Sequence, residues 1–253
     1  MAKLASDTGW EEKGGVRAIF RYLLLLGLLA ALAFPGPAGV SFAEKKYEEA
    51  REKMVQVQIE ARGIANEKVL TAMREVPRHL FVPPEDRSRA YEDYPLPIGF
   101  GQTISQPYIV ALMTELLNLK KEAQVLEVGT GSGYQAAILS RIADEVYTVE
   151  IISQLATRAE KTLRELGYRN VHVANLDGYN GWREHAPYDV IIVTAAAEFI
   201  PPPLIKQLKV GGLMCIPVGP PFSVQNLFLV KKKGEKEIET RVITQVAFVP
   251  LVH

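Results

Sequence analysis

Short apolar runs recur along the second half of the chain and predict the buried strands of a parallel sheet, because such strands are covered on both faces. The runs are residues 125–128, 145–150, 170–175, 189–194 and 213–218. A short helix is expected after the prolines at 201–203, running through Leu208 and stopping before Gly211. Residues 226–232 and 237–249 are joined by a turn at 233–236 and predict an antiparallel hairpin. Together these elements predict an α/β fold with a Rossmann-like, doubly wound, mainly parallel sheet and a C-terminal hairpin at its edge.

Helical spacing of apolar residues predicts two helices before the sheet. The first is expected from about Glu44 to Arg62, with Gly63 as its stop. The second starts after Asn66, a good helix-capping residue, and ends at Pro77. Its apolar positions recur every three or four residues, at Val69, Leu70, Met73 and Val76. We expect both helices to form an N-terminal cap on a domain that covers residues 44–253.

The segment 125–134 reads Val-Leu-Glu-Val-Gly-Thr-Gly-Ser-Gly-Tyr, so that a strand runs into alternating glycines. These glycines are Gly129, Gly131 and Gly133. Without side chains, the backbone can turn sharply and a nucleotide-like ligand can lie against it. A dinucleotide fingerprint needs a small residue one place later, where this chain has Tyr134. Glu127, two residues before the first glycine, is also unusual for a dinucleotide turn.

Two acidic residues follow the next two predicted strands. Glu150 ends the run 145–150, 21 residues after Gly129, and this position suits hydrogen bonds to both hydroxyls of a ribose. Without the glycine turn, Glu150 would instead be interpreted as a charge at a helix start. Asp177 follows the run 170–175 and is placed to bind an adenine amino group, although Asp-Gly is also a common turn.

A polar segment rich in proline and glycine precedes the glycine turn, at residues 95–108. Its sequence, Pro-Leu-Pro-Ile-Gly-Phe-Gly-Gln-Thr-Ile-Ser-Gln-Pro-Tyr, excludes a regular helix but supplies hydroxyl and amide groups. We therefore expect a rigid polar loop that acts as a substrate lid.

Several of these motifs resemble those of a known family. Glu-x-Gly-x-Gly-x-Gly at 127–133 is similar to the first motif of the class I methyltransferases that use S-adenosylmethionine (AdoMet). Together with residues 101–107, 193–196 and 248–251, it resembles the protein-L-isoaspartate (D-aspartate) O-methyltransferase family. The resemblance runs from about Met54 to Leu251.

The resemblance implies a role for individual positions. Ser105 matches the active-site serine, and Thr103 lies beside the cofactor. Glu127 faces the amino-acid end of AdoMet. The cofactor positions that match are Thr103, Glu127, Gly129, Gly131, Gly133, Glu150 and Asp177. The chain departs from the pattern at Leu176, where relatives often have glycine, and at Glu198, where they often have proline.

The implied reaction moves the methyl group of AdoMet to isoaspartyl residues of damaged proteins and peptides, with D-aspartyl residues as a further candidate. The free α-carboxylate of an isoaspartyl residue has a pKa of roughly 3.5, so it is ionised at neutral pH and needs no general base. Ser105 is therefore expected to position it by a hydrogen bond. A nucleophilic serine is not indicated, because no Gly-x-Ser-x-Gly segment surrounds Ser105.

Composition narrows the range of partners. The net charge of zero argues against a nucleic-acid partner, and the four histidines lack the spacing of metal ligands. Cys215 is the single cysteine, so no intramolecular disulfide forms. Two alternatives share the cofactor motifs: a small-molecule AdoMet methyltransferase, which would lack the segment 101–107, and a catalytically silent AdoMet-binding protein.

The first 43 residues resemble a signal peptide or a membrane anchor. Arg17 and Arg21 precede the apolar stretch 22–34, prolines follow it, and small residues at 41–43 offer a cleavage site. Because AdoMet is made inside the cell, a cytoplasmic working site is narrowly favoured. Export to the periplasm, an anchor at residues 17–43 and a start codon placed too far upstream are the alternatives. Membrane contact is expected only through this segment, if it is retained.

Overall fold

The computed structural model of the protein describes residues 42–252. The expected signal-peptide or anchor segment therefore lies outside the described residues, apart from its last two positions. No helix among residues 42–252 is long and apolar enough to cross a membrane.

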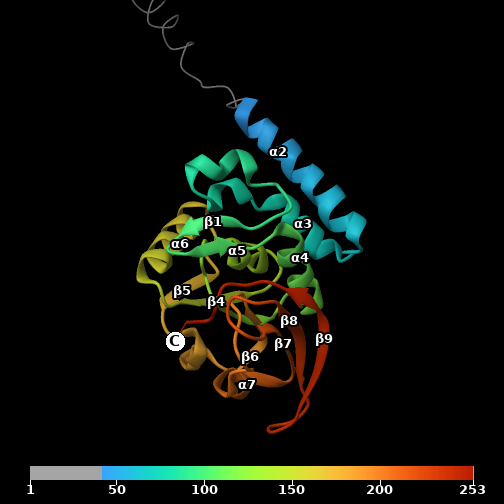
Figure 1. Ribbon diagram of the computed structural model, residues 1–253, viewed down its shortest axis with the longest axis vertical. Helices are drawn as coiled ribbons and strands as arrows, with labels where there is room; N and C mark the ends of the chain where they lie inside the picture. Colours follow the sequence, from blue (N-terminus) through green and yellow to red (C-terminus); the bar gives the residue numbers. More distant parts are fainter. Residues whose placement is uncertain (1–41, 253) are drawn as a thin grey trace, which may run out of the picture. The chain divides into compact units, whose positions relative to one another are not determined.

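A mixed sheet forms the centre of this part of the chain, with strand order β5-β4-β3-β6-β7-β8-β9 (Figure 1). Its strands are β3 (Gln124–Val128), β4 (Glu145–Glu150), β5 (Val171–Asn175), β6 (Tyr188–Val193), β7 (Leu208–Val218), β8 (Gln225–Lys232) and β9 (Ile238–Val246). The strands from β5 to β7 pair in parallel, and β8 and β9 are antiparallel. The predicted doubly wound sheet with a C-terminal hairpin is confirmed.

One boundary differs from the sequence prediction. The helix α7 (Pro202–Gln207) ends before Leu208, and β7 begins there, so Gly211 and Gly212 lie inside the strand. The pairing of β7 with β6 shifts register between Tyr188 and Val190. Such an irregularity accommodates glycines within a strand, which is why the glycine pair does not mark the strand's start.

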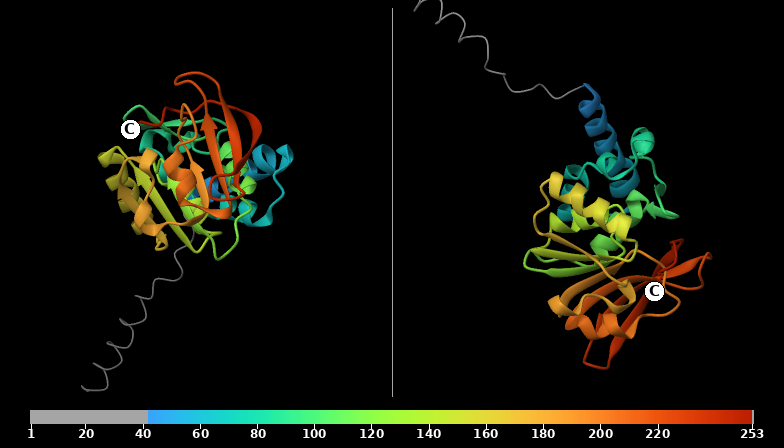
Figure 2. Two further views of the ribbon diagram at one scale, coloured as in Figure 1. Left: turned by 90° about the horizontal axis from the view of Figure 1, so that it is seen from below. Right: turned by 90° about the vertical axis from the view of Figure 1, so that its left-hand side faces the viewer.

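Helices cover both faces of the sheet (Figure 2). On one face lie α3 (Glu67–Glu75), α4 (Pro107–Leu116), α5 (Tyr134–Ser140) and α6 (Ser153–Glu165), and on the other lies α7. Successive residues of a strand pack on opposite faces of the sheet. Val125 packs with the N-terminal helices, whereas Leu126 packs on the face of α7. This alternation follows from the two-residue period of a strand and explains why the runs are apolar throughout.

The N-terminal helices form as predicted. Helix α2 (Phe42–Met54) continues through a π-helical turn (Val55–Ile59) and a 3₁₀ turn (Glu60–Arg62) to Gly63, which has a φ of 94°. Asn66 caps α3 by accepting a hydrogen bond from the Lys68 amide.

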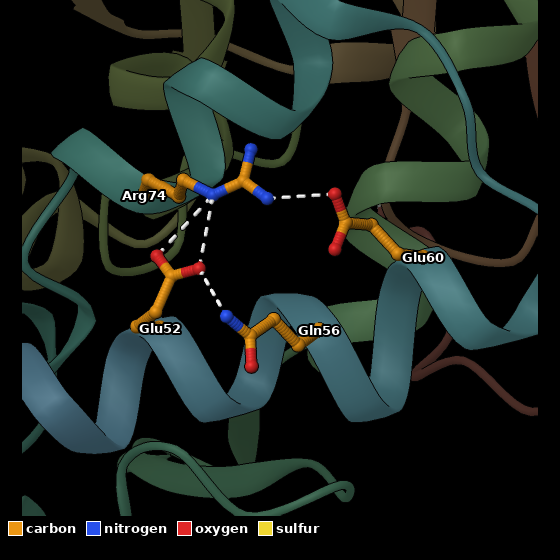
Figure 3. A network of polar contacts seen from close by, with 4 residues as sticks. All are labelled: Glu52, Gln56, Glu60 and Arg74. Carbon is orange, nitrogen blue, oxygen red and sulfur yellow. Dashed lines mark hydrogen bonds and ion pairs between the residues drawn. The ribbon is translucent and has the colours of Figure 1, made fainter.

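An ion-pair cluster joins α3 to the preceding helix (Figure 3). Arg74 contacts Glu52 at 3.2 Å and Glu60 at 2.6 Å, and Gln56 donates a hydrogen bond to Glu52. These charges are partly exposed, so each pair contributes at most about 1 kcal/mol. Burial of Val55 and Ile59 against the core is the larger contribution.

The segment 95–108 contains regular structure that the sequence did not indicate. Strands β1 (Leu96–Gly99) and β2 (Gln102–Ile104) pair as an antiparallel hairpin, so the expected rigid polar loop is wrong for these residues. The turn between them places Phe100 and Gly101 at positive φ angles, 55° and 70°. Ser105 follows the hairpin directly, and α4 begins at Pro107.

Candidate active site

The glycine turn between β3 and α5 lines a cavity at the carboxyl ends of the parallel strands. Gly129 has a φ of 99°, and a Cβ atom there would lie 2.5 Å from the Thr194 hydroxyl oxygen. That hydroxyl donates a hydrogen bond to the Gly129 carbonyl at 2.7 Å. Only glycine therefore lets β6 approach the turn so closely.

Glu150 is bound to the same turn from the tip of β4. One carboxylate oxygen accepts a hydrogen bond from the Gly131 amide at 2.8 Å, and the other accepts one from the Ile152 amide at 3.0 Å. A carboxylate can accept about four hydrogen bonds, so it retains capacity for two hydroxyl donors. Glu150 also lines the cavity, where it is held in a fixed orientation.

Glu127 is completely buried behind the turn. Thr148 donates a hydrogen bond to one of its oxygens at 2.5 Å, and the hydroxyl oxygens of Thr130 and Thr148 lie 2.7 Å apart. Burial raises the pKa of Glu127 from 4.5 to about 8; the hydrogen bond from Thr148 opposes this rise and the charge of Glu150 adds to it. The second carboxylate oxygen has no hydrogen-bond partner among residues 42–252. An unpaired buried acceptor of this kind suits a cationic ligand group such as an ammonium.

Further lining of the cavity comes from β2, from Ser105 directly after it and from the C-terminal tail. Thr103 and Ser105 line it from the hairpin side. The tail is held by hydrogen bonds of Ala196, whose amide donates to Val249 and whose carbonyl accepts from Leu251, both at 2.8 Å. The two motifs at 193–196 and 248–251, far apart in sequence, therefore meet at one wall.

The structure places Asp177 differently from the other predicted residues. Its carboxylate accepts hydrogen bonds from the Tyr179 amide at 2.9 Å and from the Asn180 side chain at 3.0 Å, and so caps a 3₁₀ turn. The adjacent Gly178 lines the cavity, whereas Asp177 does not. The contact of Asp177 with adenine remains a prediction.

Of the predicted residues, five line the cavity together: Thr103, Ser105, Gly129, Gly131 and Glu150. Glu127 and Gly133 support the turn without lining it, and a Cβ atom on Gly133 would lie 3.1 Å from Leu163 of α6. Thr194 and Gly178 are lining residues that the sequence reasoning did not assign. The Val-Thr-Ala-Ala motif contains Thr194 and the Asp-Gly pair contains Gly178, so these motifs could have indicated both residues. Among residues 42–252, no group of three or more His, Cys, Asp or Glu residues could hold a metal ion.

A glycine turn after the central strand, an acidic residue at the tip of the next strand and a cavity between them define a Rossmann-like protein with a site for a nucleotide-like ligand. The profile of the family "Protein-L-isoaspartate(D-aspartate) O-methyltransferase (PCMT)" matches residues 49–253. The chain therefore belongs to this family of AdoMet-dependent enzymes.

Individual relatives agree with this assignment. The chain is 56% identical over 223 residues to protein-L-isoaspartate O-methyltransferase 2 of Shewanella sediminis, covering 88% of each chain. It is 54% identical over 236 residues to the enzyme of that name from Syntrophobacter fumaroxidans, covering 90% of this chain and 95% of the relative.

Two solved structures are also similar. One is a protein-L-isoaspartate O-methyltransferase, with a TM-score of 0.73 and 33% identity over 80% of this chain and 66% of that one. A Plasmodium falciparum structure of this type contains S-adenosyl-L-homocysteine, with a TM-score of 0.69 and 25% identity over 80% of this chain and 98% of that one.

Proposed function

We propose that this protein repairs damaged proteins by transferring the methyl group of AdoMet to the free α-carboxylate of L-isoaspartyl residues. The observation that carries this proposal is the shared cavity, which Ser105 and Thr103 line together with the glycine turn and Glu150. D-aspartyl residues, which also present a displaced carboxylate, are the second substrate that the family name suggests.

The residues around the turn fit AdoMet. Glu150 would accept hydrogen bonds from the ribose hydroxyls. Glu127 lies buried behind the turn, where the positive charge of the ammonium at the amino-acid end would favour its ionised form and be attracted to it. Gly129 and Gly131 leave room for the ligand beside the backbone. When bound, AdoMet supplies a methyl group activated by a positively charged sulfur.

Ser105 is the residue that we assign to the substrate. An isoaspartyl α-carboxylate with a pKa of roughly 3.5 is already ionised at neutral pH, so the protein needs to orient it and to remove part of its water. Orientation alone can lower a barrier by roughly 7–11 kcal/mol. The Ser105 hydroxyl would donate one hydrogen bond to the carboxylate and remain chemically unchanged.

Location in the cell follows from the supply of AdoMet. Because AdoMet is made from ATP inside the cell, we infer a cytoplasmic working site, with the periplasm and a membrane-anchored form as alternatives. Fractionation of cells that carry a C-terminally tagged protein distinguishes these locations. Recovery of active protein only from the periplasm or the membrane would overturn the cytoplasmic assignment.

Locating the transferred methyl group tests the reaction. The protein is incubated with AdoMet and an isoaspartyl peptide, and the product is fragmented in a mass spectrometer under conditions that preserve esters. We expect one methyl group on the isoaspartyl residue, as an α-carboxyl ester. A methyl group elsewhere on the peptide, or one trapped on Ser105, would contradict direct transfer. Methylation of free small carboxylic acids but not of the peptide would favour a small-molecule methyltransferase.

A further inference from the structure

A second hollow lies next to the cavity on the side of Ser105. Thr103, Ser105, Thr194 and Val249 line both spaces, so the two are adjacent and share a wall. The other residues that line the second hollow, here called the side groove, are Pro95, Gln106, Ile109, Val224, Gln245, Val246, Ala247 and Phe248. None of these twelve residues carries a charge, although 23% of the chain is Asp, Glu, Lys or Arg.

The outer wall of the side groove is built around one buried polar residue, Gln225. Its side-chain amide donates hydrogen bonds to the carbonyls of Pro220, at 3.2 Å, and Ser223, at 2.7 Å. Its oxygen accepts a hydrogen bond from the Phe248 amide at 2.9 Å. Gln225 is 1% exposed. It therefore holds the loop 219–224 and the C-terminal tail together, and this gives the side groove a fixed wall.

The loop held in this way presents apolar side chains to solvent. Val224 lines the groove and is 57% exposed, and Phe222 is 91% exposed. Phe222 also has a φ of 58°, in the left-handed region that favours glycine. Large apolar residues displayed on a built wall, next to an active site, are typical of a surface that binds a partner.

We propose that the side groove binds the polypeptide adjacent to the isoaspartyl residue, and that Val224 and Phe222 select substrates with an apolar side chain there. This proposal rests on the proposed function, because Ser105, where the isoaspartyl carboxylate would bind, also lines the groove. The substrate chain must leave the cavity in some direction. The side groove shares Ser105 and Thr103 with the cavity, so it offers the chain such a direction.

The uncharged lining explains why the groove would prefer an apolar substrate side chain to a charged one. A charged side chain that enters the groove loses water and finds no ion-pair partner among the lining residues. An apolar side chain instead gains by covering Val224, Phe222 and the neighbouring apolar surface. Discrimination by an apolar pocket is typically roughly 10- to 200-fold in kcat/KM. Because this groove is open to solvent, we expect the lower end, roughly tenfold.

The test compares isoaspartyl peptides that differ at one position. Leu or Glu is placed directly before the isoaspartyl residue in one pair and directly after it in a second pair, and kcat/KM is measured for each. We expect wild-type protein to prefer Leu by roughly tenfold on one of the two sides. Val224→Ser and Phe222→Ser together should reduce that preference to less than about threefold, with AdoMet affinity unchanged.

The matched control is Val210→Ser, because Val210 is 55% exposed and lies at the opposite end of β7 from the loop. This variant should keep the wild-type preference. Efficient methylation of all four peptides without preference would overturn the side-groove proposal and leave the proposed function standing. A preference that survives the paired substitutions would also overturn it. Absence of methylation from every isoaspartyl peptide would instead overturn the proposed function and, with it, this proposal.

Discussion

Replacing Glu127 with Gln should change how the stability of the AdoMet-free protein depends on pH. Glu127 is fully buried, and burial raises its pKa from 4.5 to about 8. Gln has nearly the same shape and its oxygen can still accept the hydrogen bond from Thr148, but it carries no ionisable group. The substitution therefore isolates the cost of ionising a carboxyl group behind the glycine turn.

The direction of the effect follows from the raised pKa. The folded protein holds the Glu127 proton more tightly than the unfolded chain does. The contribution of Glu127 to stability is therefore fully present below pH 4.5, and it is lost as the pH rises through about 8. Each unit of pH well inside this interval corresponds to about 1.4 kcal/mol, and the slope is smaller near its two ends, so the loss between pH 5 and pH 8 is roughly 3–4 kcal/mol.

Urea unfolding of wild type and Glu127→Gln at several pH values from 5 to 8 measures this difference. The free energy of unfolding of wild type, minus that of the variant, should fall by roughly 3–4 kcal/mol across the series, because other titrating groups cancel. Glu122→Gln, which alters an exposed residue just before β3, is the control and should give a flat difference. If the difference in free energy of unfolding between wild type and Glu127→Gln stays constant within about 1 kcal/mol over this pH range, Glu127 does not have a raised pKa in the folded protein.

Two further substitutions test the two sides of the cavity. Glu150→Ala removes a charged acceptor of hydrogen bonds from the ribose hydroxyls, and each such bond is worth roughly 1.5–3 kcal/mol. The variant should therefore bind AdoMet at least tenfold more weakly while the protein stays folded. Unchanged affinity by calorimetry would leave Glu150 with only its structural bonds to Gly131 and Ile152. Ser105→Ala should lower turnover with little change in AdoMet affinity, and the loss should be the same from about pH 6 to 8, because a carboxylate with a pKa of roughly 3.5 does not titrate there. Wild-type turnover in Ser105→Ala would show that the hydroxyl does not position the substrate.

Much of the fold can be predicted from the sequence because its strands are apolar on both faces and its turns contain glycine. The segment Glu145–Glu150 forms a strand with the expected bounds, and Asn66 caps its helix as expected. The β1–β2 hairpin was missed because its strands are short and its turn places Phe100, a residue other than glycine, at positive φ. Composition favours a loop there, whereas pairing with a neighbouring strand determines the structure.

The candidate site was predicted less completely, because some of its contacts join segments distant in sequence. Glu150 and Ser105 line one cavity, and their roles toward AdoMet and the substrate remain predictions. The sequence shows that Asp177 is an acidic residue after a strand, but whether it caps a 3₁₀ turn depends on how the following residues fold. Gln225 had no sequence signal, since its partners at Ser223 and Phe248 come together only when the tail folds back.

The most direct test of the proposed repair function is methyl transfer from labelled AdoMet to two peptides of identical sequence, one with an isoaspartyl and one with a normal aspartyl linkage. The two peptides have the same charge and composition, so only the position of the free carboxylate distinguishes them. We predict labelling of the isoaspartyl peptide and background labelling of the aspartyl peptide. Equal labelling of both peptides would contradict the assignment.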